Sequence, residues 1–391
     1  MIGGELPASI ECFLAAQERY ERLQEAVQRG AGLSLCDLGY ANAYGGPPTS
    51  VIESIQECLK SDRALDLQYT PYGGATITRR LVAERLSQSH SLRFGWRSVI
   101  MTPGAMAAIN LLFRALRTDR PVDEVIVVVP SWFDYPLYLA NLGLRPVFVP
   151  LDPQTLRLDV GRIADAISPA TRAIIFSQPA NPTGLIYSPE ELAALAEALA
   201  ARPDNRILLI SDECHRDTIF QGCQFTSPSQ YYDNTCIVYS FGKRFRMQGQ
   251  RIGYVAVSPR MPEHATFGRR LERLCRVTGF CTPTALMQLA VRRLLTLEVD
   301  ISISERRRNL VIGRLRDAGY HLQPSQGTFF LYPRSPIQDD FTFVELLAQR
   351  GVLVLPAALF HHSGYFRMAL TAPDSHIERA LQVLTAAAHD C

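Results

Sequence analysis

The sequence predicts an α/β protein, in which a three-layer domain is built on a mainly parallel seven-stranded sheet and a smaller α+β domain lies beside it. Short runs rich in β-branched residues recur between residues 99 and 257: SVIMT, EVIVVV, RPVFVP, RAIIFS, RILLIS, TCIVYS and IGYVAV. They are mostly apolar on both faces, which is typical of strands buried between two layers of helices. Helical patterns separate them. One of these, over residues 189–202, follows the capping residue Ser188 and begins with acids.

The remaining segments predict the smaller domain. Helical patterns dominate from about residue 262, and the later runs GTFFLYPR, GVLVLP and YFRMAL alternate with further helical stretches. A first helix has apolar residues at helical spacing, and we expect that face to pack on the core. We therefore expect an N-terminal arm with part of the small domain at 1–60, a large domain at 61–285 and a C-terminal small domain at 286–391.

Composition excludes several classes of protein. The 391 residues include 40 Lys+Arg and 38 Asp+Glu, a net charge of +2 with no dominant basic block, so we expect no nucleic acid partner. Nine cysteines without a C-x-x-C pair favour reduced thiols and a cytoplasmic protein. The histidines and cysteines follow no metal-ligand spacing, so we expect no metal. We also expect no signal peptide and no membrane span.

The residues that follow the predicted strands suggest a ligand site, because α/β sheets bind ligands at the carboxyl ends of their strands. After the first strand, Gly104 allows a tight turn, and the amides of Ala105 and Met106 open a helix suited to a phosphate. After the second, Trp132 could stack on a flat ring. After the fourth, Asn181 precedes a Pro-Thr-Gly turn that would fix its amide toward a ligand. Ordinary turns and core packing explain each residue equally well when it is taken alone.

Charged residues follow the next two strands. Asp212 and His215 lie after the fifth strand, and a carboxylate buried there needs a cationic partner or a shifted pKa. Ser240, Lys243 and Arg251 follow the sixth strand, on a turn that leads into the next one. A surface lysine with surface arginines beside it is the alternative interpretation of this stretch.

Taken together and in order, these residues resemble the fold type I enzymes that depend on pyridoxal 5′-phosphate (PLP), within the aminotransferase class I/II family. The resemblance covers the chain from about residue 37 to residue 384. It rests on an ordered set of motifs: Tyr69-x-x-x-x-Gly74, Gly104-Ala105, Pro130-x-Trp132, Asn181-Pro-Thr-Gly, Asp212-Glu213, Ser240-x-x-Lys243, Arg251 and Arg367.

The resemblance implies how the cofactor is held. Lys243 would carry it as a Schiff base and then move the proton at the substrate Cα, and Asp212 would keep the pyridine nitrogen protonated. Asn181 would hydrogen-bond O3′ of the ring, and Trp132 would stack on the ring face. The phosphate would bind the side chains and amides of the predicted cradle, namely Ser240, Arg251, Ala105 and Met106 with the Gly104 turn.

Two further residues matter for substrate and assembly. Arg367 matches the arginine that clamps the substrate α-carboxylate, with Asn181 and Gly39 nearby. Tyr69 matches a tyrosine that reaches the phosphate of the other subunit. The resemblance therefore implies a homodimer whose active sites are shared between subunits.

Two departures from the family pattern leave the reaction open. Most aminotransferases of this class carry tyrosine where this chain has His215, and SDECHRD is similar to the S-D-E-I-H-x-D of cystathionine β-lyase-like enzymes. The stretch LGYANAYGGPP lacks the usual Gly-x-Pro substrate loop, although Gly39 lies near the position of the family's glycine.

We therefore predict a PLP-dependent aminotransferase acting on an L-amino acid and a 2-oxo acid. The alternative is a PLP-dependent lyase, cyclase or β/γ-elimination or replacement enzyme of a specialised pathway. A third hypothesis is a non-catalytic PLP-binding module, such as the sensor domains of helix-turn-helix regulators. It is disfavoured because the resemblance starts within the first forty residues and the charge is near neutral.

Overall fold

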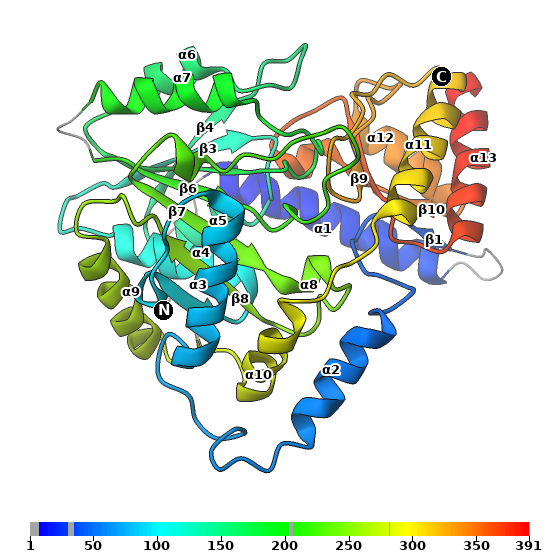
Figure 1. Ribbon diagram of the computed structural model, residues 1–391. Helices are drawn as coiled ribbons and strands as arrows, with labels where there is room; N and C mark the ends of the chain where they lie inside the picture. Colours follow the sequence, from blue (N-terminus) through cyan, green and yellow to red (C-terminus); the bar gives the residue numbers. More distant parts are fainter. Residues whose placement is uncertain (1–7, 30–34, 203–205, 281, 391) are drawn as a thin grey trace.

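The computed structural model of the chain describes residues 8–29, 35–202, 206–280 and 282–390, which form a larger and a smaller lobe (Figure 1). The first seven residues of the expected N-terminal arm, and Cys391, lie outside the described residues. No helix within the described ranges has both the length and the apolar character needed to cross a membrane.

A seven-stranded sheet forms the centre of the larger lobe, which confirms the predicted fold class. Its order is β2-β8-β7-β6-β5-β3-β4. Strand β8 pairs antiparallel with β2 and β7, while the other strands share one direction. The strands are β2 (Val99–Thr102), β3 (Glu124–Val129), β4 (Arg145–Pro150), β5 (Thr171–Ser177), β6 (Leu208–Asp212), β7 (Thr235–Ser240) and β8 (Gly253–Val257).

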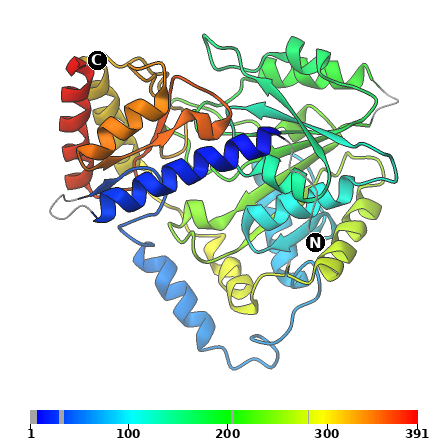
Figure 2. The ribbon, with the colours of Figure 1, turned by 180° about the vertical axis from the view of Figure 1, so that it is seen from behind.

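Helices cover both faces of this sheet and make the lobe three-layered (Figures 1 and 2). On one face α4, α5 and α9 bury strand residues such as Ile100 and Val127. On the opposite face α3 and α10 cover the half of the sheet that contains β2 and β8, and α6 and α7 cover the half that contains β3 and β5. These helices are α3 (Thr76–His90), α4 (Gly104–Leu116), α5 (Tyr135–Asn141), α6 (Val160–Asp165), α7 (Pro189–Ala200), α9 (His264–Thr278) and α10 (Ala285–Leu294), with the short α8 (Phe241–Arg244), η1 (Trp96–Ser98) and η2 (Pro228–Gln230) between strands.

The smaller lobe combines short strands with three helices. Strand β1 pairs in parallel with β10, and a separate antiparallel sheet has the order β11-β12-β9. The strands are β1 (Cys36–Asp37), β9 (Phe330–Leu331), β10 (Val352–Leu353), β11 (Leu355–Pro356) and β12 (Phe366–Ala369). The helices are α11 (Ser302–Asp317), α12 (Asp340–Gln349) and α13 (Asp374–Asp390), with η3 (Ala357–Phe360).

The N-terminal segment links the two lobes. Helix α1 (Ala8–Arg29) packs against α12 and η3 of the smaller lobe and against α5 of the larger one (Figure 2). Its buried residues Phe13 and Tyr20 share one apolar cluster with both lobes. Helix α2 (Thr49–Leu59), in contrast, packs against α10. We keep the boundaries 1–60, 61–285 and 286–391 as a proposal. The packing of residues 49–59 on a helix of the larger lobe bears on the first of them.

Candidate active site

The residues singled out in the sequence lie at one edge of the large sheet. Asp212 and Ser240 are the last residues of the parallel strands β6 and β7, and Lys243 lies in α8 directly after β7. Asn181 lies in the loop after β5, and Gly104 begins α4 after β2. Because these strands run in the same direction, their carboxyl ends meet at this edge.

Lys243 is set up as a reactive amine. Its Nζ lies 5.6 Å from the ring centroid of Phe329, a residue beside β9 of the smaller lobe. Burial lowers the pKa of Lys243 to about 8, because the charged ammonium loses solvation. The only other lysine of the chain, Lys60, is exposed and paired with Glu57. Lys243 is therefore the partly buried lysine available for covalent chemistry.

Asp212 is held by two donors. The hydroxyl of Tyr135 donates to its Oδ2 across 2.6 Å, and the backbone amide of Cys214 donates to its Oδ1 across 3.1 Å. Burial raises the pKa of Asp212, and hydrogen bonds from Cys214 and Tyr135 act against this rise. No motif in the sequence pointed to Tyr135; the only signal is its place three residues after Trp132.

Arg367, on β12, lies entirely inside the protein. Its Nη1 donates to Oδ1 of Asn181 across 3.0 Å, and its Nη2 donates to the carbonyl of Gly39 across 2.8 Å. The guanidinium lies 4.1 Å from the ring centroid of Phe330, and burial lowers the pKa of Arg367 to about 9. The structure thus brings together the three residues expected to bind substrate.

His215 lies in the same apolar surroundings. Its ring makes edge contacts with Phe329 and Phe330, at centroid distances of 5.0 and 5.5 Å. Its buried Nδ1 has no hydrogen-bond partner among the described residues. Burial lowers the pKa of His215 well below its ordinary value, and the charges of Lys243 and Arg367 lower it further. The imidazole is therefore neutral at pH 7.

The residues expected to bind a phosphate lie at the start of α4, before α8 and before β8. Gly104 has φ +79°, and a Cβ on it would lie 2.9 Å from Nη2 of Arg251. Arg251 also donates to the carbonyl of Gln248 across 2.6 Å and lies 3.6 Å from Sδ of Met106. Ala105 follows in the first turn of α4, and the buried Ser240 precedes α8. Only glycine at 104 leaves room for this arginine beside the helix N-terminus.

The two remaining cofactor residues expected from the sequence are Trp132 and Tyr69. Trp132 stacks on Phe133, with ring centroids 4.3 Å apart, after the end of β3. Tyr69 is 104% exposed. An exposed Tyr69 agrees with a role in another subunit, and nothing within this chain tests that role.

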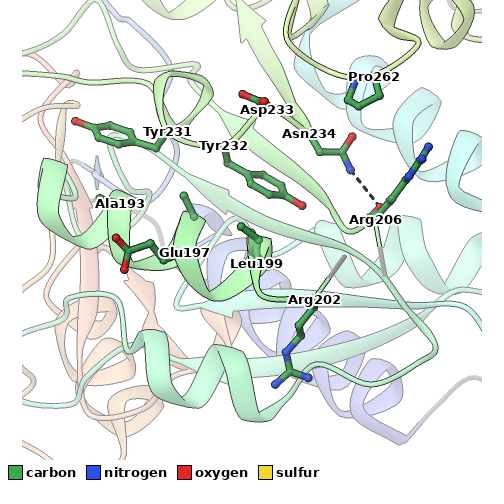
Figure 3. Close-up of a pocket in the computed structure, with 12 residues that line it drawn as sticks. Ala193, Glu197, Leu199, Arg202, Arg206, Tyr231, Tyr232, Asp233, Asn234 and Pro262 are labelled. Carbon is green, nitrogen blue, oxygen red and sulfur yellow. Dashed lines mark hydrogen bonds between the residues drawn. The ribbon is translucent and has the colours of Figure 1, made fainter. Parts of the chain in front are cut away.

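A cavity of about 390 Å³ opens beside Lys243, with Phe329, Arg246 and Leu370 in its wall. A larger cavity, of about 530 Å³, lies between α7 and the loop that carries Tyr231 and Tyr232 (Figure 3). It contains none of the residues expected from the sequence. We take the cavity beside Lys243 as the candidate active site, because the reactive amine forms part of its wall.

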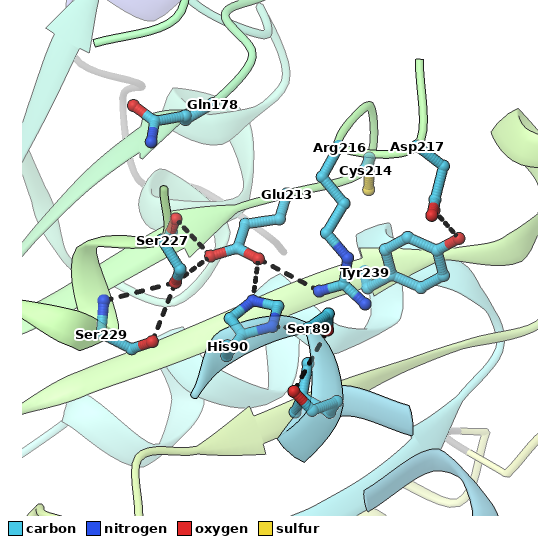
Figure 4. A network of polar contacts seen from close by, with 12 residues as sticks. Ser89, His90, Gln178, Glu213, Cys214, Arg216, Asp217, Ser227, Ser229 and Tyr239 are labelled. Atoms are coloured by element: carbon cyan, nitrogen blue, oxygen red, sulfur yellow. Dashed lines mark hydrogen bonds and ion pairs between the residues drawn. The ribbon is translucent and has the colours of Figure 1, made fainter. Parts of the chain in front are cut away.

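A buried polar network supports the strand end that carries Asp212 (Figure 4). Glu213 receives hydrogen bonds from His90 at 2.9 Å, Arg216 at 3.1 Å and Ser227 at 2.5 Å. Burial raises the pKa of Glu213, but His90 and Arg216 outweigh that effect and lower it. The side chains of successive residues therefore point in alternate directions. Asp212 and Cys214 belong to the site, whereas Glu213 is held by the buried network on the opposite side of the backbone.

The described residues fit pyridoxal phosphate and an amino acid substrate. Nε of Arg367 and Nδ1 of His215 are buried polar atoms without a partner in the described part of the chain. Lys243 supplies an amine of lowered pKa, and Gly104 lets the Arg251 guanidinium approach the N-terminus of α4, where a phosphate would find both a cation and backbone amides. No group of three or more His, Cys, Asp or Glu residues in the described ranges is placed to hold a metal. The fold and site define the class of PLP-dependent enzymes that act on amino acids.

Comparison with known proteins identifies the family within that class. Residues 34–384 match the family model for aminotransferase class I and II, and the chain belongs to this family. The probable aspartate/prephenate aminotransferase of Thermus aquaticus is 30% identical over 367 residues, 90% of this chain and 91% of that protein. The aspartate/prephenate aminotransferase of Cereibacter sphaeroides is 28% identical over 375 residues, 90% of each chain.

Solved structures agree. An aminotransferase from Eubacterium rectale superposes with a TM-score of 0.90 at 26% identity, covering 99% of both chains. The aspartate aminotransferase of Thermus thermophilus with maleate gives a TM-score of 0.84 at 25% identity, covering 98% of this chain and 100% of that one. Members of the family use PLP, so the protein is a PLP-dependent aminotransferase.

Proposed function

We propose that Lys243 is the residue that carries the cofactor and that Arg367 binds the α-carboxylate of an L-amino acid. The observation that carries this proposal is the placement of Lys243, an amine of lowered pKa, near Asp212, His215 and Arg367. When bound, PLP supplies an electron sink for the charge that forms at the substrate α-carbon.

The residues of the chain then divide the work. Nε of Arg367 has no partner within the described ranges, so this side chain offers charge-assisted hydrogen bonds to the α-carboxylate while Asn181 and Gly39 hold its other nitrogens. Lys243, half neutral near pH 8, accepts the proton from Cα and returns it. Asp212 would be the carboxylate partner that keeps the ring nitrogen protonated. The apolar rings of Phe329 and Phe330 keep water from this space.

The test is transfer between two substrates. Purified protein supplied with PLP, an amino acid and a 2-oxo acid should form a new amino acid only when both substrates are present. Lys243→Ala should abolish this product, whereas Lys60→Ala, which removes the exposed lysine, should leave it unchanged. A Lys243→Ala protein with wild-type transfer would contradict the assignment.

We propose that an acidic amino acid such as aspartate is the substrate that donates the amino group. Two relatives are named for aspartate and prephenate, and the cavity beside Lys243 contains Arg246 in its wall. An arginine there would pair with a side-chain carboxylate. Comparing aspartate with asparagine, which has the same shape without the charge, tests this: equal kcat/KM for both would contradict it.

A second candidate reaction is β- or γ-elimination or replacement, and His215 favours it. His215 is a neutral, buried imidazole beside Lys243, and its Nδ1 has no partner among the residues that the structure describes, so it is a second group able to accept a proton. Single β-substituted amino acids supplied without an oxo acid should then yield pyruvate and ammonia. Absence of both products, together with transfer to an oxo acid, would exclude this reaction.

We further propose that the protein works as a homodimer. Large apolar side chains are exposed around Tyr69, among them Leu65 at 77%, Leu67 at 48% and Tyr72 at 48%. A second copy would cover this surface and place Tyr69 near the partner's phosphate site. Sedimentation should give twice the chain mass, and Tyr69→Phe should weaken PLP binding without dissociating the dimer. A monomer with full PLP affinity would contradict this proposal.

A cytoplasmic location is also proposed. The described cysteines Cys12, Cys36, Cys58, Cys214, Cys223, Cys236 and Cys275 are free thiols. Reduced thiols agree with a reducing compartment, since disulfides persist mainly in oxidising ones. Fractionation of the native cells, followed by activity in the cytoplasmic fraction, would test it.

A further inference from the structure

Tyr135 contacts the acid of the site, yet none of the roles proposed above includes it. It is the first residue of α5 and is 0% exposed. Its hydroxyl donates to Oδ2 of Asp212 across 2.6 Å, while the amide of Cys214 donates to Oδ1. Each carboxylate oxygen therefore has its own donor. The two bonds together fix the plane of the carboxylate.

The hydroxyl also favours the charged form of Asp212. Burial raises the pKa of Asp212, and the Cys214 and Tyr135 hydrogen bonds counteract the rise. Burial and the neighbouring carboxylate raise the pKa of Tyr135 well above its ordinary value. The proton therefore stays on the phenol and the negative charge stays on Asp212, as a charge-assisted hydrogen bond requires.

The same bond joins two parts of the site that are distant in sequence. Tyr135 and Asp212 are 77 residues apart, on segments that follow β3 and end β6, and β5 lies between these strands in the sheet. The amide of Tyr135 donates to the carbonyl of Trp132 across 3.4 Å. The position of the Trp132 loop is thus tied to the position of the Asp212 carboxylate.

We propose that Tyr135 is a positioning residue, whose hydroxyl keeps Asp212 ionised and at a fixed angle to the cofactor ring. The inference rests on the proposed role of Asp212 as the partner of the ring nitrogen. Tyr135 would act only through Asp212, and we assign it no contact with the substrate.

The test measures PLP binding to apo-protein by absorbance titration over a range of pH. Tyr135→Phe removes one oxygen and should raise the dissociation constant about tenfold, the effect of losing one hydrogen bond to a charged group. The acid limb of binding should move to higher pH, because a group that lowers the pKa of Asp212 is gone. Wild-type affinity and an unshifted limb would overturn the proposal.

Tyr320→Phe is the matched control. The Tyr320 hydroxyl donates to the carbonyl of Leu384 across 2.9 Å, and the side chain is buried in the smaller lobe, away from Asp212. This variant should keep the wild-type PLP affinity and pH dependence. An equal loss in both variants would mean that Tyr135 acts only through general stability, and would overturn the proposal.

A double-mutant cycle separates positioning from packing. In the Asp212→Asn background, Tyr135→Phe should cause no further loss of PLP affinity, because the charge on which the hydroxyl acts is absent. The same loss in both backgrounds would contradict the proposal, and any packing defect of Tyr135→Phe is common to the two. A wild-type protein that binds no PLP would instead contradict the proposed function, so the two failures are distinguishable.

Discussion

Nε2 of His90 lies 2.9 Å from Oε2 of Glu213, and the two side chains are 1% and 0% exposed although 123 residues separate them in the chain. The pair joins the end of α3 to the residue that follows Asp212. Removing one partner of a buried pair leaves the other without compensation, which costs far more than the pair itself contributes.

Glu213→Ala should therefore lower the free energy of unfolding by about 3–5 kcal/mol. His90 would lose its carboxylate partner, and Arg216 would keep only the neutral hydroxyl of Tyr254 as an acceptor. Urea unfolding of the apo-protein measures the change. Glu57→Ala, which breaks an exposed pair with Lys60, should leave the midpoint unchanged. Equal effects in the two variants would contradict the importance of the buried network.

Lys243 should react with an amine reagent at unusually low pH. Its pKa of about 8 makes half of the amine neutral at that pH, whereas an ordinary lysine reaches this point near 10.5. Trinitrobenzenesulfonate labelling of apo-protein carrying Lys60→Arg, read by mass spectrometry on the peptide that bears Lys243, reports on Lys243 alone, because the chain has no other lysine and any labelled α-amine lies on a different peptide. A midpoint near 10.5 would rule out the lowered pKa.

Arg367→Lys should weaken the binding of α-amino acids. A lysine keeps the charge but loses the planar pair of donors that a carboxylate accepts. Losing that pairing costs about 1.5–3 kcal/mol, which corresponds to roughly a ten- to hundredfold rise in KM. An amine substrate without the carboxylate serves as the control and should show the same KM in both proteins. An unchanged KM for the amino acid would remove the assignment.

Acid should destabilise the smaller lobe through His361 and His362. Burial lowers the pKa of each to about 4, so between about 6.5 and 4 the unfolded chain binds more protons than the folded one. Stability should fall as the pH drops through that window. His361 stacks on Phe148 with centroids 4.3 Å apart, so His361→Phe preserves packing and should flatten the decline. The same change at exposed His321 should not.

The sequence predicts the sheet well because each strand is an apolar run followed by turn residues. It does not reveal that β8 runs antiparallel, since an apolar run such as IGYVAV fits either direction. Strand β1 has only Cys36 and Asp37, too short for any period to identify. Helix α2 packs on α10, which is more than 200 residues away in the chain, and no local sequence pattern predicts such a contact.

The site was predictable where chemistry depends on rare residue types in a fixed order. Lys243, Asp212, Asn181 and Arg367 belong to that group, and their roles stay predictions until the variants are measured. Tyr135 and Phe329 were missed because a tyrosine or phenylalanine in an apolar segment is indistinguishable from core. Only the distance of 2.6 Å to Asp212 singles out Tyr135.

The hydrogen bond from Arg367 to the carbonyl of Gly39 spans 328 residues, nearly the whole chain. During synthesis the strands β2 to β8 emerge long before Arg367 does, so the large sheet is able to collapse while the carboxylate clamp does not yet exist. A ribosome-bound chain ending near residue 300 would therefore have the lysine and the acid, but no means of gripping an amino acid. The residues that grip the substrate carboxylate are therefore assembled only after the large sheet has left the ribosome.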